Sequence, residues 1–180
     1  MAMGDVVSAH RLVEFINTRH CPDGDDVLAD GRGAAWLADW LGAPGVRIGP
    51  EELAPLRELR EGLRQLAAAN NGEEPAADAV AAAAKIVDAV PLRMRLGDQE
   101  QDPGLVAVGP DIVEQSIAAV AHTYLAVRTD GVWSRIKSCA AADCRWAYLD
   151  ISRNGSRRWC DMANCGNRAK NREWRRRSQL

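Results

Sequence analysis

Four of the five cysteines lie near the C-terminus, in two pairs that share the same internal spacing. Four residues separate Cys139 from Cys144, fifteen residues follow, and four residues separate Cys160 from Cys165. Two close pairs of thiolates can supply the four corners of a tetrahedral Zn²⁺ site when the chain between them folds back. The spacing therefore predicts one Zn²⁺ ion bound by these four cysteines.

Two disulfides are the alternative use of such cysteines, and they persist only in oxidising compartments. Residues 1–10 have no basic segment followed by an apolar core, so no secretion signal is predicted. No run approaches the roughly 18 to 20 apolar residues of a membrane-spanning helix. We therefore expect a cytoplasmic protein that binds zinc and no membrane. The fifth cysteine, Cys21, is expected to be a free thiol beside His20.

The chain between the two cysteine pairs contains Asn154-Gly155, a strong sequence signal for a type I′ turn. We expect this turn to join extended segments at residues 146–152 and 156–160 in a hairpin. Asp161 can cap a following helix that carries the fourth cysteine in its first turn. A knuckle, a hairpin and a helix around one metal ion form the treble-clef arrangement.

The first 130 residues show the apolar spacing of helices, with one short interruption. Helices are predicted at about residues 9–16, 36–41, 50–69, 75–90 and 111–128. Two extended runs, 91–96 and 105–108, predict a small hairpin. The expected fold class is α+β and mainly α: a helical domain at residues 1–130 with a small β-hairpin, followed by a treble-clef zinc finger at residues 131–180.

The formal net charge of −2 is the sum of two regions of opposite sign. Residues 133–180 hold twelve Lys and Arg against four Asp and Glu, a balance of +8, and the first 132 residues hold eleven against twenty-one, a balance of −10. Glu173 is the only acid between Arg168 and Arg177, whereas a merely solvated helix would mix signs. Guanidinium groups suit phosphate oxygens and the guanine edge, so we expect nucleic acid as the partner.

The finger region closely resembles the CGNR zinc finger, through Ser152 to Cys160 and the run Cys165-Gly166-Asn167-Arg168. The preceding region resembles the ABATE domain more loosely, through Phe15-Ile16-Asn17-Thr18 and the helix at 36–41. In bacterial proteins this domain precedes the finger. The resemblance implies a stress-responsive transcription regulator, with a sensing first domain, a DNA-binding finger and the four cysteines as zinc ligands.

Nine residues are expected to contact the nucleic acid. Most are cations of the finger, three of which recur on one face of the last helix, and the resemblance adds Asn167. The set is Arg153, Arg157, Arg158, Asn167, Arg168, Lys170, Arg172, Arg175 and Arg176.

Catalysis is not predicted. His122 is the last histidine, and metal-dependent nucleases built on treble clefs need histidines at the cleavage site. The chain also lacks a Gly-x-Ser-x-Gly elbow, a phosphate-binding glycine loop and a His-Glu-x-x-His motif. An RNA-binding module or a zinc-stapled protein–protein module is the alternative function, because Trp159 and Trp174 could stack on unpaired bases.

Two further partners follow from weaker signals. Asn17, Thr18 and Arg19 could line a pocket for a small-molecule effector, or could cap a helix and support the loop that follows. A single finger reads few base pairs, and a symmetric homodimer would contact more of the DNA.

Overall fold

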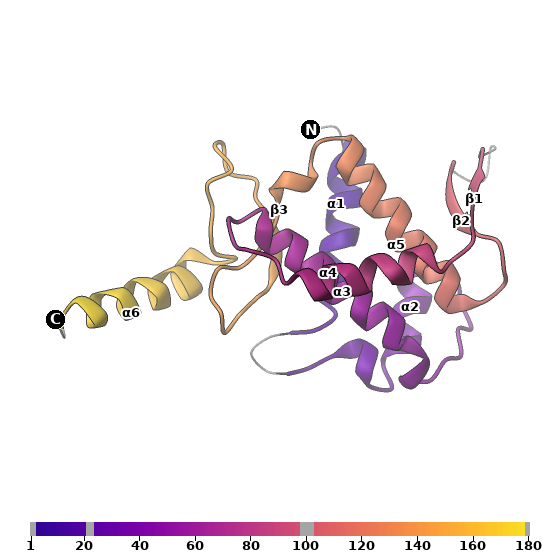
Figure 1. Ribbon diagram of the computed structural model, residues 1–180, viewed down its shortest axis with the longest axis horizontal. Helices are drawn as coiled ribbons and strands as arrows, with labels where there is room; N and C mark the ends of the chain where they lie inside the picture. Colours follow the sequence, from indigo (N-terminus) through magenta and orange to yellow (C-terminus); the bar gives the residue numbers. More distant parts are fainter. Residues whose placement is uncertain (1–2, 21–23, 98–102, 179–180) are drawn as a thin grey trace.

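The computed structural model describes residues 3–20, 24–97 and 103–178, and this part of the chain is mainly helical (Figure 1). The helices are α1 (Met3–Ile16), α2 (Gly33–Leu41), α3 (Ala54–Ala69), α4 (Ala77–Asp88), α5 (Ile112–Thr129) and α6 (Asn167–Arg177). The strands are β1 (Leu92–Arg95), β2 (Gly104–Ala107), β3 (Ile136–Ser138) and β4 (Ala147–Leu149). Short turns of helix are η1 (Val27–Ala29), η2 (Glu51–Leu53), η3 (Trp133–Arg135) and η4 (Met162–Gly166). None of the described helices has the length and apolarity to cross a membrane.

The five predicted helices of the first region are confirmed, and local signals fix their ends. Gly42 adopts a left-handed conformation, with φ of 65°, and ends α2. Asp111 caps α5 by accepting hydrogen bonds from the backbone N–H groups of Val113 and Glu114. Helices α3 and α4 pack closely where Gly62 faces Ala83, because a Cβ at Gly62 would lie 2.2 Å from the Ala83 Cβ. The apolar faces of these helices form one buried core.

The predicted first hairpin is also confirmed, as an antiparallel pair of β1 and β2 that begins with Leu92 opposite Ala107. Strand β2 packs against α5, where the Leu105 N–H donates to Nδ1 of His122 at 3.3 Å. Figure 1 places this hairpin at the opposite end of the molecule from α6. The hairpin is therefore remote from the cysteines.

The second predicted hairpin is wrong. Strand β4 pairs with β3, with Ile136 opposite Leu149, and residues 156–160 form no strand. The turn does form, but it is not type I′, because Gly155 has a positive φ and Asn154 does not. The reason is a buried carboxylate: Asp150 accepts a hydrogen bond from the Arg157 N–H, so the loop closes around this side chain instead of pairing two strands.

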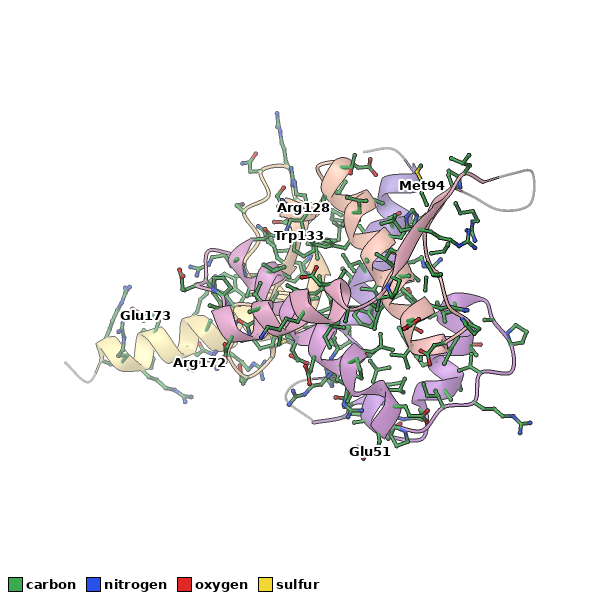
Figure 2. The ribbon with its side chains drawn as sticks, turned by 45° about the vertical axis from the view of Figure 1, so that its right-hand side comes forward. Glu51, Met94, Arg128, Trp133, Arg172 and Glu173 are labelled. Carbon is green, nitrogen blue, oxygen red and sulfur yellow. The ribbon has the colours of Figure 1, made fainter. Side chains whose placement is uncertain are left out.

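The finger and the helices share a core. Trp133, Ile136, Ala147 and Leu149 are buried in the same apolar cluster as the helices, and Figure 2 shows Trp133 inside the body. Asn17, just after α1, both donates to the Ala147 carbonyl and accepts from the Ala147 N–H, at 2.9 and 2.8 Å. The side chain thus extends the β3–β4 sheet toward α1.

Asparagines at the end of α3 make a second connection between the helices and the finger. Asn70 donates to the carbonyls of Trp133 and Ile136, and Asn71 donates to the carbonyl of Ser138. Since backbone carbonyls inside a protein need donors, these amides replace strand partners that the short sheet lacks. The finger is thereby fixed to the helical region through its strands, while α6 is left free of that interface.

Candidate metal centre and basic surface

The four predicted ligands meet in one cluster. Cys139 follows β3 directly, and Cys144 ends a tight turn in which its N–H donates to the Ala141 carbonyl at 2.9 Å. Cys160 ends the loop that surrounds Asp150, and Cys165 lies in η4. The four Sγ atoms all lie within 4.8 Å of one another.

The sulfur positions fit a tetrahedral zinc ion. Zn–S bonds of about 2.3 Å at tetrahedral angles place sulfurs about 3.8 Å apart. The Sγ atoms of Cys144 and Cys160 are 3.5 Å apart, and those of Cys160 and Cys165 are 3.7 Å apart. Four soft sulfur donors with no disulfide between them are a structural zinc set. The chain therefore positions Cys139, Cys144, Cys160 and Cys165 to bind a zinc ion.

The thiols need a cation to ionise together. Burial raises the pKa of Cys144 to about 11, and burial together with neighbouring sulfurs raises the pKa of Cys160. Burial also acts to raise the pKa of Cys165, but hydrogen bonds outweigh it, first among them one from Arg168, and the pKa is lowered. A bound metal ion supplies the charge that keeps all four sulfurs as thiolates.

A buried ion pair supports the centre, and no motif or spacing in the sequence pointed to it. The Lys137 Nζ donates to the Asp150 carboxylate at 2.8 Å, and both side chains are buried. Burial alone would raise the pKa of Asp150, yet this hydrogen bond and those from Ser152 and Arg157 lower it to about 2. The ionised carboxylate accepts hydrogen bonds from Lys137, Ser152 and Arg157, and these bonds hold the loop that carries Cys160.

Helix α6 begins at the metal centre and extends away from the body (Figure 1). Asp161 caps η4, the turn that carries Cys165 and continues directly into α6, by accepting from the Ala163 N–H at 2.8 Å; the predicted cap is thus confirmed for this turn. No residue of α6 is buried, and Figure 2 shows Arg172 and Glu173 on the part of the helix that projects. The helix therefore offers its side chains to solvent along its whole length.

Some of the predicted contact residues on α6 form ion pairs within the finger, and others do not. Arg168 donates to the Cys165 sulfur at 3.3 Å and lies 3.4 Å from the Asp143 carboxylate, to which Arg172 also comes within 3.5 Å. Arg176 pairs with Glu173. Lys170 and Arg175 make no ion pair with any residue that the structure describes. Arg168 and Arg172 thus also brace the finger, whereas Lys170 and Arg175 are free for a partner.

The remaining predicted contact residues lie beside the start of α6. Arg157 donates to the Trp159 carbonyl at 2.8 Å and covers the Tyr148 ring. The Arg158 guanidinium carbon lies 5.9 Å from the centre of the Trp159 ring. Arg153 is exposed, and Asn167 donates to the Ala163 carbonyl at 2.9 Å. Their nucleic-acid contacts stay a prediction.

The three residues predicted to line an effector pocket have separate environments. Asn17 bonds to Ala147, as described above, and the Thr18 hydroxyl donates to the Phe15 carbonyl and accepts from buried Arg60. Arg19 borders two small hollows, of about 350 and 180 Å³. Cys21 lies outside the described residues.

Comparison with known families agrees with the order of the two regions. A model named ABATE, described as "Putative stress-induced transcription regulator", matches residues 9–131. The model of the CGNR zinc finger matches residues 135–178. Both resemblances drawn from the sequence are thereby confirmed. No curated protein matches the chain.

Proposed function

Because the chain belongs to the ABATE family, whose description is "Putative stress-induced transcription regulator", and carries a CGNR zinc finger, we propose that it is a zinc-dependent, DNA-binding transcription regulator. The helical region would receive a signal, and the finger would hold the DNA. Neither matched family is described as an enzyme, and we propose no catalytic activity. Cytoplasmic localisation is part of the same proposal.

The observation that carries the proposal is the uncovered basic helix. Six cations lie on α6, and the acids that pair with them among the described residues are Asp143 and Glu173, both in the finger itself. The acidic helical region makes no described ion pair with α6. The helical region therefore does not neutralise α6, and Lys170 and Arg175 remain available to a polyanion. A helix of this kind fits the major groove of DNA.

Zinc would act structurally in this scheme. The ion, held by the four cysteines, joins the β3 end, the loop around Asp150 and the start of α6 in a module with few apolar contacts. Removing the ion would free α6 from the body. We therefore expect DNA binding to require zinc.

The position of Arg19 supports the proposal of a small-molecule effector. The smaller hollow beside Arg19 is lined by residues of both regions, among them Arg64 of α3 and Ser138 of β3. A ligand bound there would contact the junction at which the finger is fixed. Homodimer formation, which would double the length of DNA read, is likewise proposed and is tested by sedimentation with and without DNA.

A salt titration with labelled duplex DNA tests the proposed function. Each phosphate contact contributes a slope of about −0.9 to the logarithm of affinity against the logarithm of salt concentration. The double variant Lys170→Ala/Arg175→Ala should make the slope shallower by about 2 and weaken binding about tenfold at 0.1 M salt, without releasing zinc.

Arg47→Ala is the matched control, because Arg47 is an exposed arginine of the helical region. It should leave both the slope and the affinity unchanged. A flat salt response of the wild-type protein, or tighter binding of RNA than of DNA, would favour the RNA-binding or protein–protein alternative.

A further inference from the structure

The face of α6 opposite its arginine face carries an unexplained aromatic residue. Trp174 is 68% exposed, more than any other tryptophan of the chain. Lys170, Trp174 and Arg177 follow one another at spacings of four and three, so they share one side of the helix. Arg168, Arg172 and Arg175 occupy the other side. An indole this exposed serves no purpose in the packing of the finger.

A cleft of about 500 Å³ lies between this face and the loop that ends at Cys160. Trp159 and Arg158 line it from the loop, and Lys170, Trp174 and Arg177 line it from α6. The volume falls within the range of about 300 to 1,000 Å³ that is typical of small-ligand sites. Two indoles from separate segments thus border one space.

The charge of the cleft is positive. Among the described residues, Glu173 is the only acid that lines it, and its carboxylate is already bound by Arg176 and Arg177. Hydrogen bonds from Arg176 and Arg177 also hold the pKa of Glu173 below its usual value. The cleft therefore suits a flat, π-rich group attached to an anionic chain.

An unpaired nucleobase on its sugar-phosphate chain has these properties. Aromatic rings flanked by cations bind single-stranded nucleic acid because every base has a face that can stack. A base inside a duplex has both faces covered and must first leave the stack. We propose that the cleft between Trp159 and Trp174 receives one unpaired base of the DNA bound by α6.

This inference rests on the proposed function and makes a finer statement about the same surface. The arginine face of α6 and the free cations provide affinity for the phosphate chain, whereas the cleft selects DNA that contains an unpaired base. Such a base occurs at a bulge, at a mismatch or in a partly melted promoter.

The test compares three fluorescein-labelled DNAs bound by the zinc-loaded full-length protein: an intact duplex, the same duplex with one bulged adenine, and a single strand. The bulged duplex should bind about tenfold more tightly than the intact duplex. Trp174→Ala should reduce the affinity for the bulged duplex to that for the intact duplex, which it should leave unchanged. Trp174→Phe should keep part of the preference, because a phenyl ring still stacks.

Leu96→Ala provides the matched control, since Leu96 is a large apolar side chain, 82% exposed, on the distant first hairpin. It should not alter the preference. Zinc content and circular dichroism of each variant show whether the finger is folded.

Equal affinity of the wild-type protein for intact and bulged duplexes overturns the inference and leaves the proposed function standing. A change in sedimentation coefficient on Trp174→Ala in the absence of DNA also overturns it, because the indole would then contact a second copy of the chain. If the wild-type protein binds none of the three DNAs, the proposed function itself fails.

Discussion

The helical region and the finger are stabilised by different means. The helical region has a continuous apolar core, in which Leu12, Phe15, Leu37 and Leu56 are fully buried. The finger beyond its strands has a small separate cluster that includes all four cysteines, with a few aromatic residues around them. Burial of apolar area stabilises the first region, whereas the second depends on sulfur ligands and one ion pair.

The difference shows which substitutions each region tolerates. A large core tolerates the loss of a single contact, because many others remain. The finger depends on one ion and one buried carboxylate, so the loss of either removes most of its stabilisation. The strands β3 and β4 are an intermediate case. They belong to the finger in the sequence, but their apolar side chains are buried in the helical core.

The largest expected effect is the loss of the metal. Cys160→Ser should release zinc and unfold the finger outside β3 and β4, which pack in the helical core, since structural zinc contributes on the order of 10 kcal/mol to modules of this size. The helical region should keep its circular dichroism. Elemental analysis and limited trypsin digestion measure the two outcomes, with early cuts expected at the finger arginines.

Cys21→Ser is the control, because it keeps all four cysteines of the cluster. Its zinc content should match that of the wild-type protein. One zinc ion per chain in the Cys160→Ser variant would contradict the assignment of the ligands.

A smaller loss is expected from breaking the buried ion pair. Lys137→Met leaves Asp150 without its cation and should lower the free energy of unfolding by about 3 to 5 kcal/mol. Urea unfolding followed by tryptophan fluorescence measures this change. The double variant Lys137→Met/Asp150→Asn should be less destabilised than the single variant, because no buried charge remains. A single variant within about 1 kcal/mol of wild type would show that the pair does not hold the loop.

The smallest expected effect concerns the junction between the two regions. Asn17→Ala leaves the N–H and the carbonyl of Ala147 without partners and should cost about 2 kcal/mol of unfolding free energy. Hydrogen exchange at the Ala147 amide should become faster, which separates a local opening from global unfolding. Asn17→Asp keeps the acceptor for that N–H and should protect the amide better than alanine does. Equal exchange in wild type and Asn17→Ala would contradict the contact.

Much of the fold could be predicted from local sequence. The apolar seam of α5, with Ile117, Val120 and Val127, is buried as its spacing indicates. The β1–β2 hairpin lies where two extended runs flank a polar loop. These elements depend on residues close together in the chain, and this is why their pattern is visible without a structure.

The pairing of β3 with β4 could not be predicted in the same way. Each strand has three residues, which is too short for a period of two to show, and the Asn154-Gly155 signal pointed to a different partner. The deciding interactions are long-range: Lys137 with Asp150, and Asn17 with Ala147. Polar contacts between distant residues leave no periodic trace in a sequence.

The sequence by itself determined the metal centre, because four cysteines in two close pairs, without a secretion signal, favour one Zn²⁺ ion and need only a folded-back chain to meet. It also determined that positive charge gathers in the finger. Only the tertiary structure decided which of those charges are free: Arg168 and Arg172 turn toward Asp143, whereas Lys170 and Arg175 remain exposed to solvent. The physical reason is that sulfur ligands fix where α6 begins, whereas the charges that stay free depend on which side of the helix the folded chain places Asp143.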